Sequence, residues 1–197
     1  MLSVLAGMMI AIGGTVYLTY GGIVGALLFA VGLLTILAFR LELFTGKAGH
    51  LGRELNPISP LKLADIWFGN FFGTMIVAIG LQMTGKGEAL FAAARSIVET
   101  RLANSPVENL ILGVFCGLLM YIAVEGYNQT KNSLFVLMPV ATFIISGYNH
   151  CVADMFYLAL GATSWNDYLV LIPTTIGNVI GCNILNLLQY HRDRSQV

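Results

Sequence analysis

Long apolar stretches alternate with short polar ones along the whole chain. Six stretches are apolar over most of their length, at about residues 2–19, 22–45, 65–83, 107–125, 134–160 and 168–189. An α-helix needs about 20 such residues to cross the hydrocarbon core of a bilayer. The pattern therefore predicts an all-α membrane protein with six transmembrane helices in a single domain, residues 1–197.

Two of these stretches are interrupted. The second ends in Arg40-Leu-Glu-Leu-Phe-Thr-Gly46, and the fifth contains Pro139 followed by Ser146-Gly-Tyr-Asn-His150. Because charge, proline and glycine do not continue an apolar helix, we predict a broken helix in each. Backbone groups freed at membrane depth need partners, so such breaks are confined to places that line a cavity or are buried in protein.

A short motif recurs in the two halves of the chain. Phe68-Gly-Asn-Phe-Phe-Gly73 resembles Ile176-Gly-Asn-Val-Ile-Gly181, and glycines four apart let helix backbones approach closely. The repeat sets the two broken stretches at corresponding positions of two three-span halves, at about residues 1–84 and 105–190. Three is an odd number of spans, so the halves are predicted to be inverted in the membrane. Inverted halves with paired broken helices are typical of transport sites near the midplane.

His150 is the least expected residue in the apolar pattern, because it lies in the middle of the fifth stretch. An ionisable side chain at membrane depth is expensive and is by default a functional-site hypothesis. The alternative is a histidine whose hydrogen bonds are satisfied between core helices.

The composition excludes several classes of protein. Hydrophobic residues make up 57% of the chain and charged residues 10%, whereas a soluble domain has about 25% charged residues. A formal net charge of zero argues against nucleic-acid binding. We recognise no metal-ligand cluster, no nucleophile paired with a base and no phosphate-binding loop. The sequence therefore predicts neither an enzyme nor a cofactor.

Lysine and arginine are distributed unevenly between the two sides that an even number of spans defines. The side shared by both termini has Lys47, Arg53, Lys62, Lys131, Arg192 and Arg194, and the other side has Lys86, Arg95 and Arg101. By the positive-inside rule, both termini are predicted to lie in the cytoplasm and the chain in the cytoplasmic membrane.

Five motifs, in order and across essentially the whole chain, resemble the formate/nitrite transporter family. They are Leu43-Phe-Thr45, Phe68-Gly-Asn-Phe-Phe-Gly73, Leu137-Met-Pro-Val-Ala141, Gly147-Tyr-Asn-His-Cys-Val-Ala-Asp-Met155 and Ile172-Pro-Thr-Thr-Ile-Gly-Asn178. The resemblance implies an aquaporin-like protomer of six spans in a homopentamer. It also implies one pore per protomer for small monovalent anions such as formate, nitrite or hydrosulfide.

The same resemblance implies roles for single residues in the pore. His150 matches the family's central histidine and Thr45 its hydroxyl partner, while Asn149 stands where a glutamate is more familiar. Phe143 and Leu43 match the cytoplasmic constriction, Phe29 and Leu33 match the outer one, and Phe44 is assigned to the constrictions as well. For these apolar residues the alternative is ordinary packing against lipid or core.

Two cations are expected to attract anions to the pore mouths. Arg101 falls where the family usually has a lysine in the outer vestibule, and Lys47 follows Thr45 closely. Surface charges of this kind raise the local concentration of anions. Either residue could instead be an interfacial side chain that extends its charge into the headgroup region.

The pore chemistry expected from these residues links the anion to a proton. A bare anion loses its hydration in a narrow apolar passage at a large cost in free energy. His150 is the side chain suited to handle a proton near neutral pH, so that the anion crosses the apolar rings as its neutral acid. Two alternatives stay open: a pore for a neutral solute such as water, ammonia or a small polyol on the same fold, and a membrane scaffold that transports nothing.

Overall fold

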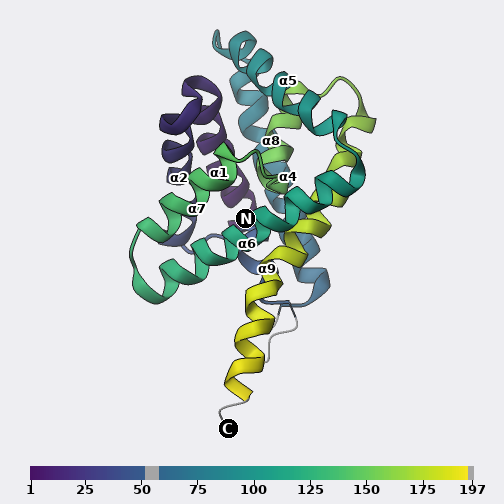
Figure 1. Cartoon of the computed structure of the whole chain (residues 1–197). Coiled ribbons are helices and arrows are strands. Elements are labelled where there is room, and N and C mark those ends of the chain that lie inside the picture. Colours follow the sequence, from purple (N-terminus) through teal and green to yellow (C-terminus); the bar gives the residue numbers. More distant parts are fainter. Residues whose placement is uncertain (52–57, 195–197) are drawn as a thin grey trace.

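The named elements of the chain are all helices (Figure 1). The computed structural model describes residues 1–51 and 58–194, so Arg53 lies outside the described residues, as do the side chains of Arg192 and Arg194. In chain order the elements are α1 (Leu2–Tyr20), α2 (Gly22–Ala38), α3 (Phe44–Ala48), α4 (Pro60–Gln82), α5 (Gly87–Ala103), α6 (Pro106–Thr130), α7 (Leu134–Ile145), α8 (Cys151–Gly161), the 3-10 helix η1 (Trp165–Val170) and α9 (Leu171–Arg194).

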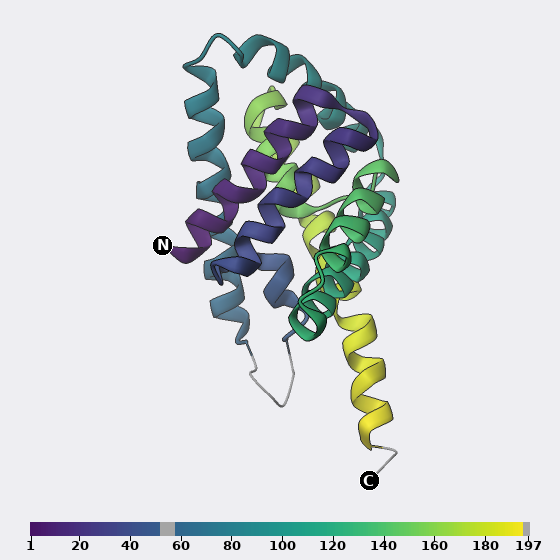
Figure 2. The same ribbon diagram turned by 90° about the vertical axis from the view of Figure 1, so that its left-hand side faces the viewer.

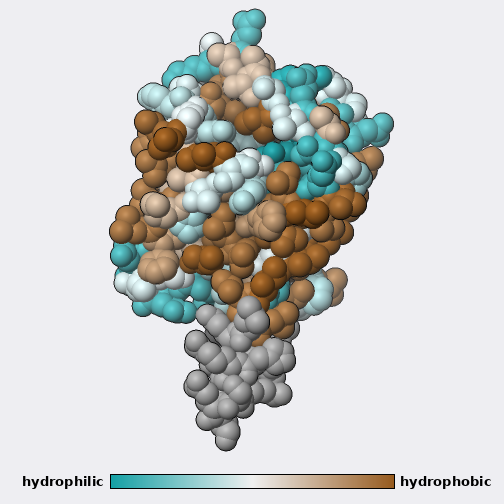
Figure 3. All heavy atoms as spheres, in the orientation of Figure 1, coloured by the Kyte–Doolittle hydropathy of each residue, from teal (hydrophilic) through white to brown (hydrophobic). Residues whose placement is uncertain are grey.

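Four helical stretches in the described part of the chain are long and apolar enough to cross a membrane. They are α1, α4, α6 and the run of η1 into α9, from Trp165 to Leu187. Helices α2, α7 and α8 are apolar but shorter. Figure 3 shows apolar residues over much of one face of the molecule, with hydrophilic residues gathered toward the end where α5 lies. These features are those of a protein surrounded by lipid.

Helix ends fall at both interruptions that the sequence predicts. Helix α2 ends at Ala38, and Arg40 then takes a left-handed backbone conformation (φ 53°) before α3 begins at Phe44. Helix α7 ends at Ile145, and Gly147 (φ 71°) turns the chain so that α8 begins at Cys151. A positive φ suits glycine and is uncommon for arginine; at Arg40 it lets the Leu41 N–H donate to the Ile36 carbonyl at 2.9 Å, which closes the end of α2.

Helix α5 was not expected from the apolar pattern, which left residues 84–106 without a helix. It buries Leu90, Ala94 and Val98, which are four residues apart and therefore share one face. This face packs against α8. In Figure 2, α5 lies at one end of the molecule and the turn between α6 and α7 lies at the other.

The two Gly-Asn motifs each join a pair of helices. A Cβ atom on Gly73 of α4 would overlap the carbonyl oxygen of Val4 in α1, and one on Gly181 of α9 would overlap the carbonyl oxygen of Val114 in α6. Because only glycine leaves room for such backbones to touch, both helix pairs are as close as the motif predicts.

Candidate functional site

His150 is buried at the start of α8, where the chain leaves the second break. Its side chain is the N-cap of the helix: the Ala153 N–H donates to His150 Nδ1 at 3.1 Å. The other ring nitrogen, Nε2, is 2.9 Å from the hydroxyl oxygen of Thr45. Since Nδ1 accepts a hydrogen bond, a neutral ring has its proton on Nε2 and donates it to Thr45. Residues His150 and Thr45 are only 1% and 2% exposed.

Helix α9 positions the short helix that carries Thr45. The thiol of Cys182 donates to the carbonyl oxygen of Thr45 at 3.4 Å. Asn183 donates to the carbonyl of Ala48 at 3.0 Å, and Asn186 to that of Gly49 at 2.9 Å. These bonds satisfy carbonyl groups at the end of α3 that have no partner within so short a helix, and they orient Thr45 toward His150.

Two buried asparagines hold the backbone at the breaks, one at each. Asn70 accepts from the Phe44 N–H (2.8 Å) and donates to the carbonyls of Glu42 (2.9 Å) and Ser3 (2.7 Å). Asn178 accepts from the Cys151 N–H (2.9 Å) and donates to the carbonyls of Asn149 and Gly113, both at 2.8 Å. Each asparagine thus hydrogen-bonds to the first residue of the second half-helix and to the residue two positions before it.

This asparagine pair is functional structure that the sequence reasoning missed. The sequence prediction rests on the glycines of the motifs alone, although Asn70 and Asn178 occupy the same position in both copies. A polar amide repeated inside two apolar stretches is itself a signal, because buried amides require several partners and broken helices supply them.

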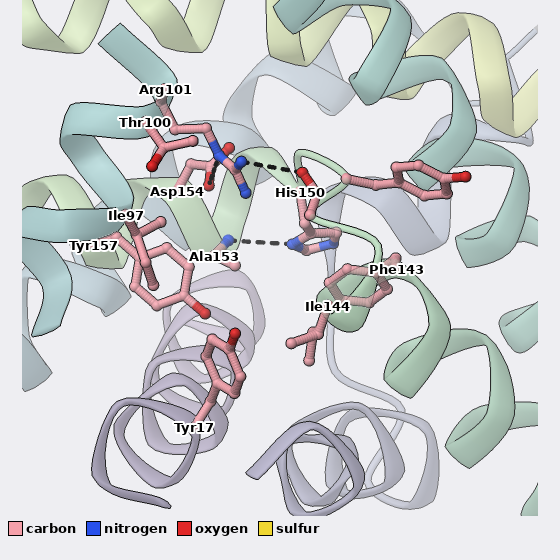
Figure 4. Close-up of a pocket in the computed structure, with 12 residues that line it drawn as sticks. Tyr17, Ile97, Thr100, Arg101, Phe143, Ile144, His150, Ala153, Asp154 and Tyr157 are labelled. Atoms are coloured by element: carbon pink, nitrogen blue, oxygen red, sulfur yellow. Dashed lines mark hydrogen bonds and ion pairs between the residues drawn. The ribbon is translucent and has the colours of Figure 1, made fainter. Parts of the chain in front are cut away.

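Two cavities lie near the His150–Thr45 pair. One, of about 180 Å³, includes His150, Phe143, Arg101 and Asp154 in its lining and is shown in Figure 4. The other, of about 300 Å³, includes Leu33, Leu43, Arg40, Lys47 and His50 in its lining. We call them the Arg101 cavity and the Lys47 cavity.

In the structure, the residues expected at the two constrictions fall into two other groups. The ring of Phe29 meets that of Phe143 edge to face, with 6.0 Å between centroids, and Phe143 stacks on the His150 ring at 5.5 Å. Leu33 and Leu43 both line the Lys47 cavity. The phenylalanines therefore belong together, as do the leucines. Phe29 and Leu33 share one face of α2 but lie about 6 Å apart along its axis, which places them at different depths.

Phe44 and Asn149 have other surroundings than the remaining pore candidates. Phe44 lines an apolar groove with Trp67 and Ile172, and Thr45 is not among the residues that line it. Asn149 donates to Asn109 of α6 at 2.7 Å. Neither residue lines the Arg101 or the Lys47 cavity. Adjacent residues of extended backbone point to opposite sides, which directs Asn149 away from the space that His150 faces.

The two cations expected to attract anions differ in their surroundings. Lys47 lines its cavity, and no ion pair to it is found among the described residues. Arg101 is not the free surface charge that was expected: its side chain is 11% exposed, and its Nε is 3.3 Å from Asp154 Oδ1. The carboxylate neutralises the guanidinium within the Arg101 cavity.

Comparison with known proteins identifies the family. A sequence model described as "Formate/nitrite transporter" matches residues 1–192. Among characterised relatives, the formate channel FocA of Haemophilus influenzae is 25% identical over 81% of this chain and 69% of its own length. The formate channel FocA of Escherichia coli is 25% identical over 96% of this chain and 84% of its own length.

Solved structures agree with this match at the level of the fold. A pentameric formate channel with formate bound superposes with a TM-score of 0.83 at 23% identity, covering 98% of this chain and 95% of that one. An FNT family ion channel also has a TM-score of 0.83, at 24% identity, and covers 97% of this chain and 88% of its own. This multi-pass membrane chain belongs to the formate/nitrite transporter family.

Proposed function

We propose that the protein is a membrane channel for small monovalent weak-acid anions, formate among them, with permeation linked to a proton at His150. The observation that carries the proposal is the buried His150–Thr45 pair, with its 2.9 Å contact, next to two cavities that each contain a cation. Relatives named as formate channels support the choice of substrate.

The apolar rings explain why a proton is needed. Phe143 stacks on His150 and meets Phe29 edge to face, and Leu33 and Leu43 line the Lys47 cavity. An anion that leaves water for such surroundings loses its hydration without compensation. Transfer of one proton to the anion removes the charge, and the neutral acid passes.

The hydrogen bonds of His150 couple protonation to the presence of an anion. A doubly protonated ring has a hydrogen on Nδ1, so it can no longer accept from the Ala153 N–H and the cap of α8 is lost. An anion beside the ring offsets this loss by pairing with the positive charge. The proton then moves to the anion, and the ring returns to its neutral form.

We propose six spans in two inverted halves, joined by α5. One half comprises α1, the broken pair α2 and α3, and α4; the other comprises α6, the broken pair α7 and α8, and α9. The matching bonds of Asn70 and Asn178 at the two breaks support this symmetry. A homopentamer is the proposed assembly, since the similar formate channel is pentameric.

We also propose that both termini are cytoplasmic, in the cytoplasmic membrane, which makes the Lys47 cavity the inner mouth and the Arg101 cavity the outer one. The uneven distribution of lysine and arginine supports this orientation. Figure 2 is consistent with it, because α5 and the turn after α6 lie at opposite ends. In this arrangement Lys47 attracts anions at the inner mouth.

The test is a flux comparison in reconstituted liposomes, with protein-free liposomes as the control. Formate, nitrite and hydrosulfide influx is measured from about pH 5 to pH 8, beside water and ammonia. Anion flux above the protein-free level, rising as the pH falls, is the expected result. A pore for neutral solutes would pass water at a rate independent of pH and would show no anion flux that rises as the pH falls, and a scaffold would leave the liposomes sealed. Either result would reject the proposal.

A further inference from the structure

The Arg101–Asp154 pair occupies the outer cavity beside His150. Arg101 of α5 reaches Asp154 of α8 at 3.3 Å, and its NH1 donates to the carbonyl oxygen of Gly147 at 3.0 Å. Gly147 belongs to the turn that leads to His150. Figure 4 shows the pair and His150 around one space. A ligand that contacts this pair is therefore next to the proposed pore histidine.

One oxygen of the carboxylate is unused. Asp154 Oδ2 is buried and has no hydrogen-bond partner among the described residues, although its residue lines the cavity. A buried polar atom without a partner costs about 1–3 kcal/mol, so this oxygen favours any ligand that brings a donor. The titratable and charged groups around it are Arg101 from α5, Tyr17 from α1, Cys116 from α6, and His150, Cys151 and Tyr157 on or beside α8.

The pair is selective by charge. The guanidinium attracts an anion, but the carboxylate beside it repels the same anion. An anion that arrives with one proton meets no such conflict: one of its oxygens accepts from Arg101, and the proton lies between another oxygen and Asp154 Oδ2. The site then gains two hydrogen bonds, and its net charge does not change because the anion and its proton together are neutral.

We propose that Arg101 and Asp154 form a binding subsite that takes up a weak-acid anion together with one proton. The proposal rests on the anion-channel function above and names the form in which the outer mouth binds the substrate. The Lys47 cavity differs in its two permanent cations: Lys47 and Arg40 line it without an ion pair in the described part of the chain, while His50 in the same lining is 3.3 Å from Glu125.

The test is the pH dependence of the formate concentration that gives half-maximal flux, measured in liposomes with equal pH on both sides. Well above the pKa of formic acid, the fraction carrying a proton falls about tenfold per pH unit. The half-maximal concentration in the wild type is therefore expected to rise about tenfold per unit. In Asp154→Asn the site has a net positive charge and binds the anion without a proton, so we expect a rise of less than about threefold per unit.

Glu99→Gln is the matched control. Glu99 is exposed on α5 and pairs with Arg95 at 2.8 Å, outside the Arg101 cavity. This variant loses the same charge and is expected to retain the wild-type pH dependence. Wild-type dependence in Asp154→Asn would overturn the subsite. It would leave the channel function intact, because that function fails only if the wild type carries no anion above the protein-free level.

A second variant keeps the proposal testable if the unpaired Arg101 prevents folding. Arg101→Gln combined with Asp154→Asn removes both charges and leaves the cavity neutral. The two charge-assisted hydrogen bonds to the acid become weaker bonds between neutral groups, so the half-maximal concentration at about pH 5 is expected to rise severalfold. A wild-type half-maximal concentration at that pH would also contradict the subsite.

Discussion

Removing the amide of Asn178 tests whether the breaks are held as described. The side chain is fully buried and makes three hydrogen bonds to backbone groups, at 2.8, 2.8 and 2.9 Å. Asn178→Ala leaves those three groups without partners. At about 1–3 kcal/mol each, the loss is at least about 3 kcal/mol.

A loss of this size is measurable as a shift in thermal unfolding of the detergent-solubilised protein. For a chain of this length, about 1 kcal/mol lowers the melting temperature by roughly 2–4 °C. We therefore expect Asn178→Ala to melt at least about 6 °C below the wild type. Asn166→Ala, at an exposed asparagine, is the control and is expected to melt like the wild type.

Asn70→Ala makes the experiment specific to the proposed symmetry. Asn70 also makes three bonds to backbone groups at its break, at 2.7, 2.8 and 2.9 Å. It is expected to show a similar loss of stability. If either variant melts within about 1 °C of the wild type, the bonds do not hold the breaks and the reasoning is wrong.

Three further substitutions test the pore and the packing. Thr45→Val removes the hydroxyl partner of His150, so formate flux is expected to fall about two- to tenfold. Thr45→Ser keeps a hydroxyl and is expected to keep the wild-type flux. Wild-type flux in Thr45→Val would show that the hydroxyl has no role in permeation. Gly181→Ala is expected to reduce the free energy of unfolding by about 1–3 kcal/mol through overpacking, and so to lower the melting temperature. Gly80→Ala, with open space around it, is the control and is expected to melt no lower than the wild type. Similar melting of the two variants would contradict the close helix pair. Lys47→Ala is expected to reduce formate flux severalfold at low ionic strength. At about 1 M salt, charges are screened beyond about 3 Å, so the variant is expected to match the wild type. Equal flux of the two proteins at low salt would exclude a role of Lys47 in attracting anions.

The helices that cross the membrane could be predicted from the sequence because apolar length and helix breakers report directly on burial in lipid. Helix ends at Ala38 and Ile145 follow the predicted interruptions. Helix α5 could not be found this way, since its buried face consists of Leu90, Ala94 and Val98 among charged residues. Such a helix is recognised only once α8 is in place to cover that face.

The contact between Thr45 and His150 was implied by the family resemblance; the two residues lie 2.9 Å apart in the structure, and the role of the pair stays a prediction. The directions of neighbouring side chains were not predictable. Asn149 and Phe44 each adjoin a pore candidate, yet local backbone conformation turns them toward α6 and toward the groove beside Trp67. The sequence suggests that Arg101 is a free cation, because Asp154 is 53 residues away in sequence. The fold brings Asp154 Oδ1 to 3.3 Å from Arg101 Nε.

The central claim is that a proton at His150 accompanies the anion, and the direct measurement compares formate flux in the wild type and in His150→Asn between about pH 5 and pH 8. Both proteins are reconstituted at equal density, and the flux of protein-free liposomes is subtracted. The asparagine is polar and can still hydrogen-bond but cannot take up a proton in this range. The account predicts that the variant loses most of the flux and its rise toward low pH. Unchanged flux with an unchanged pH dependence in His150→Asn would contradict it.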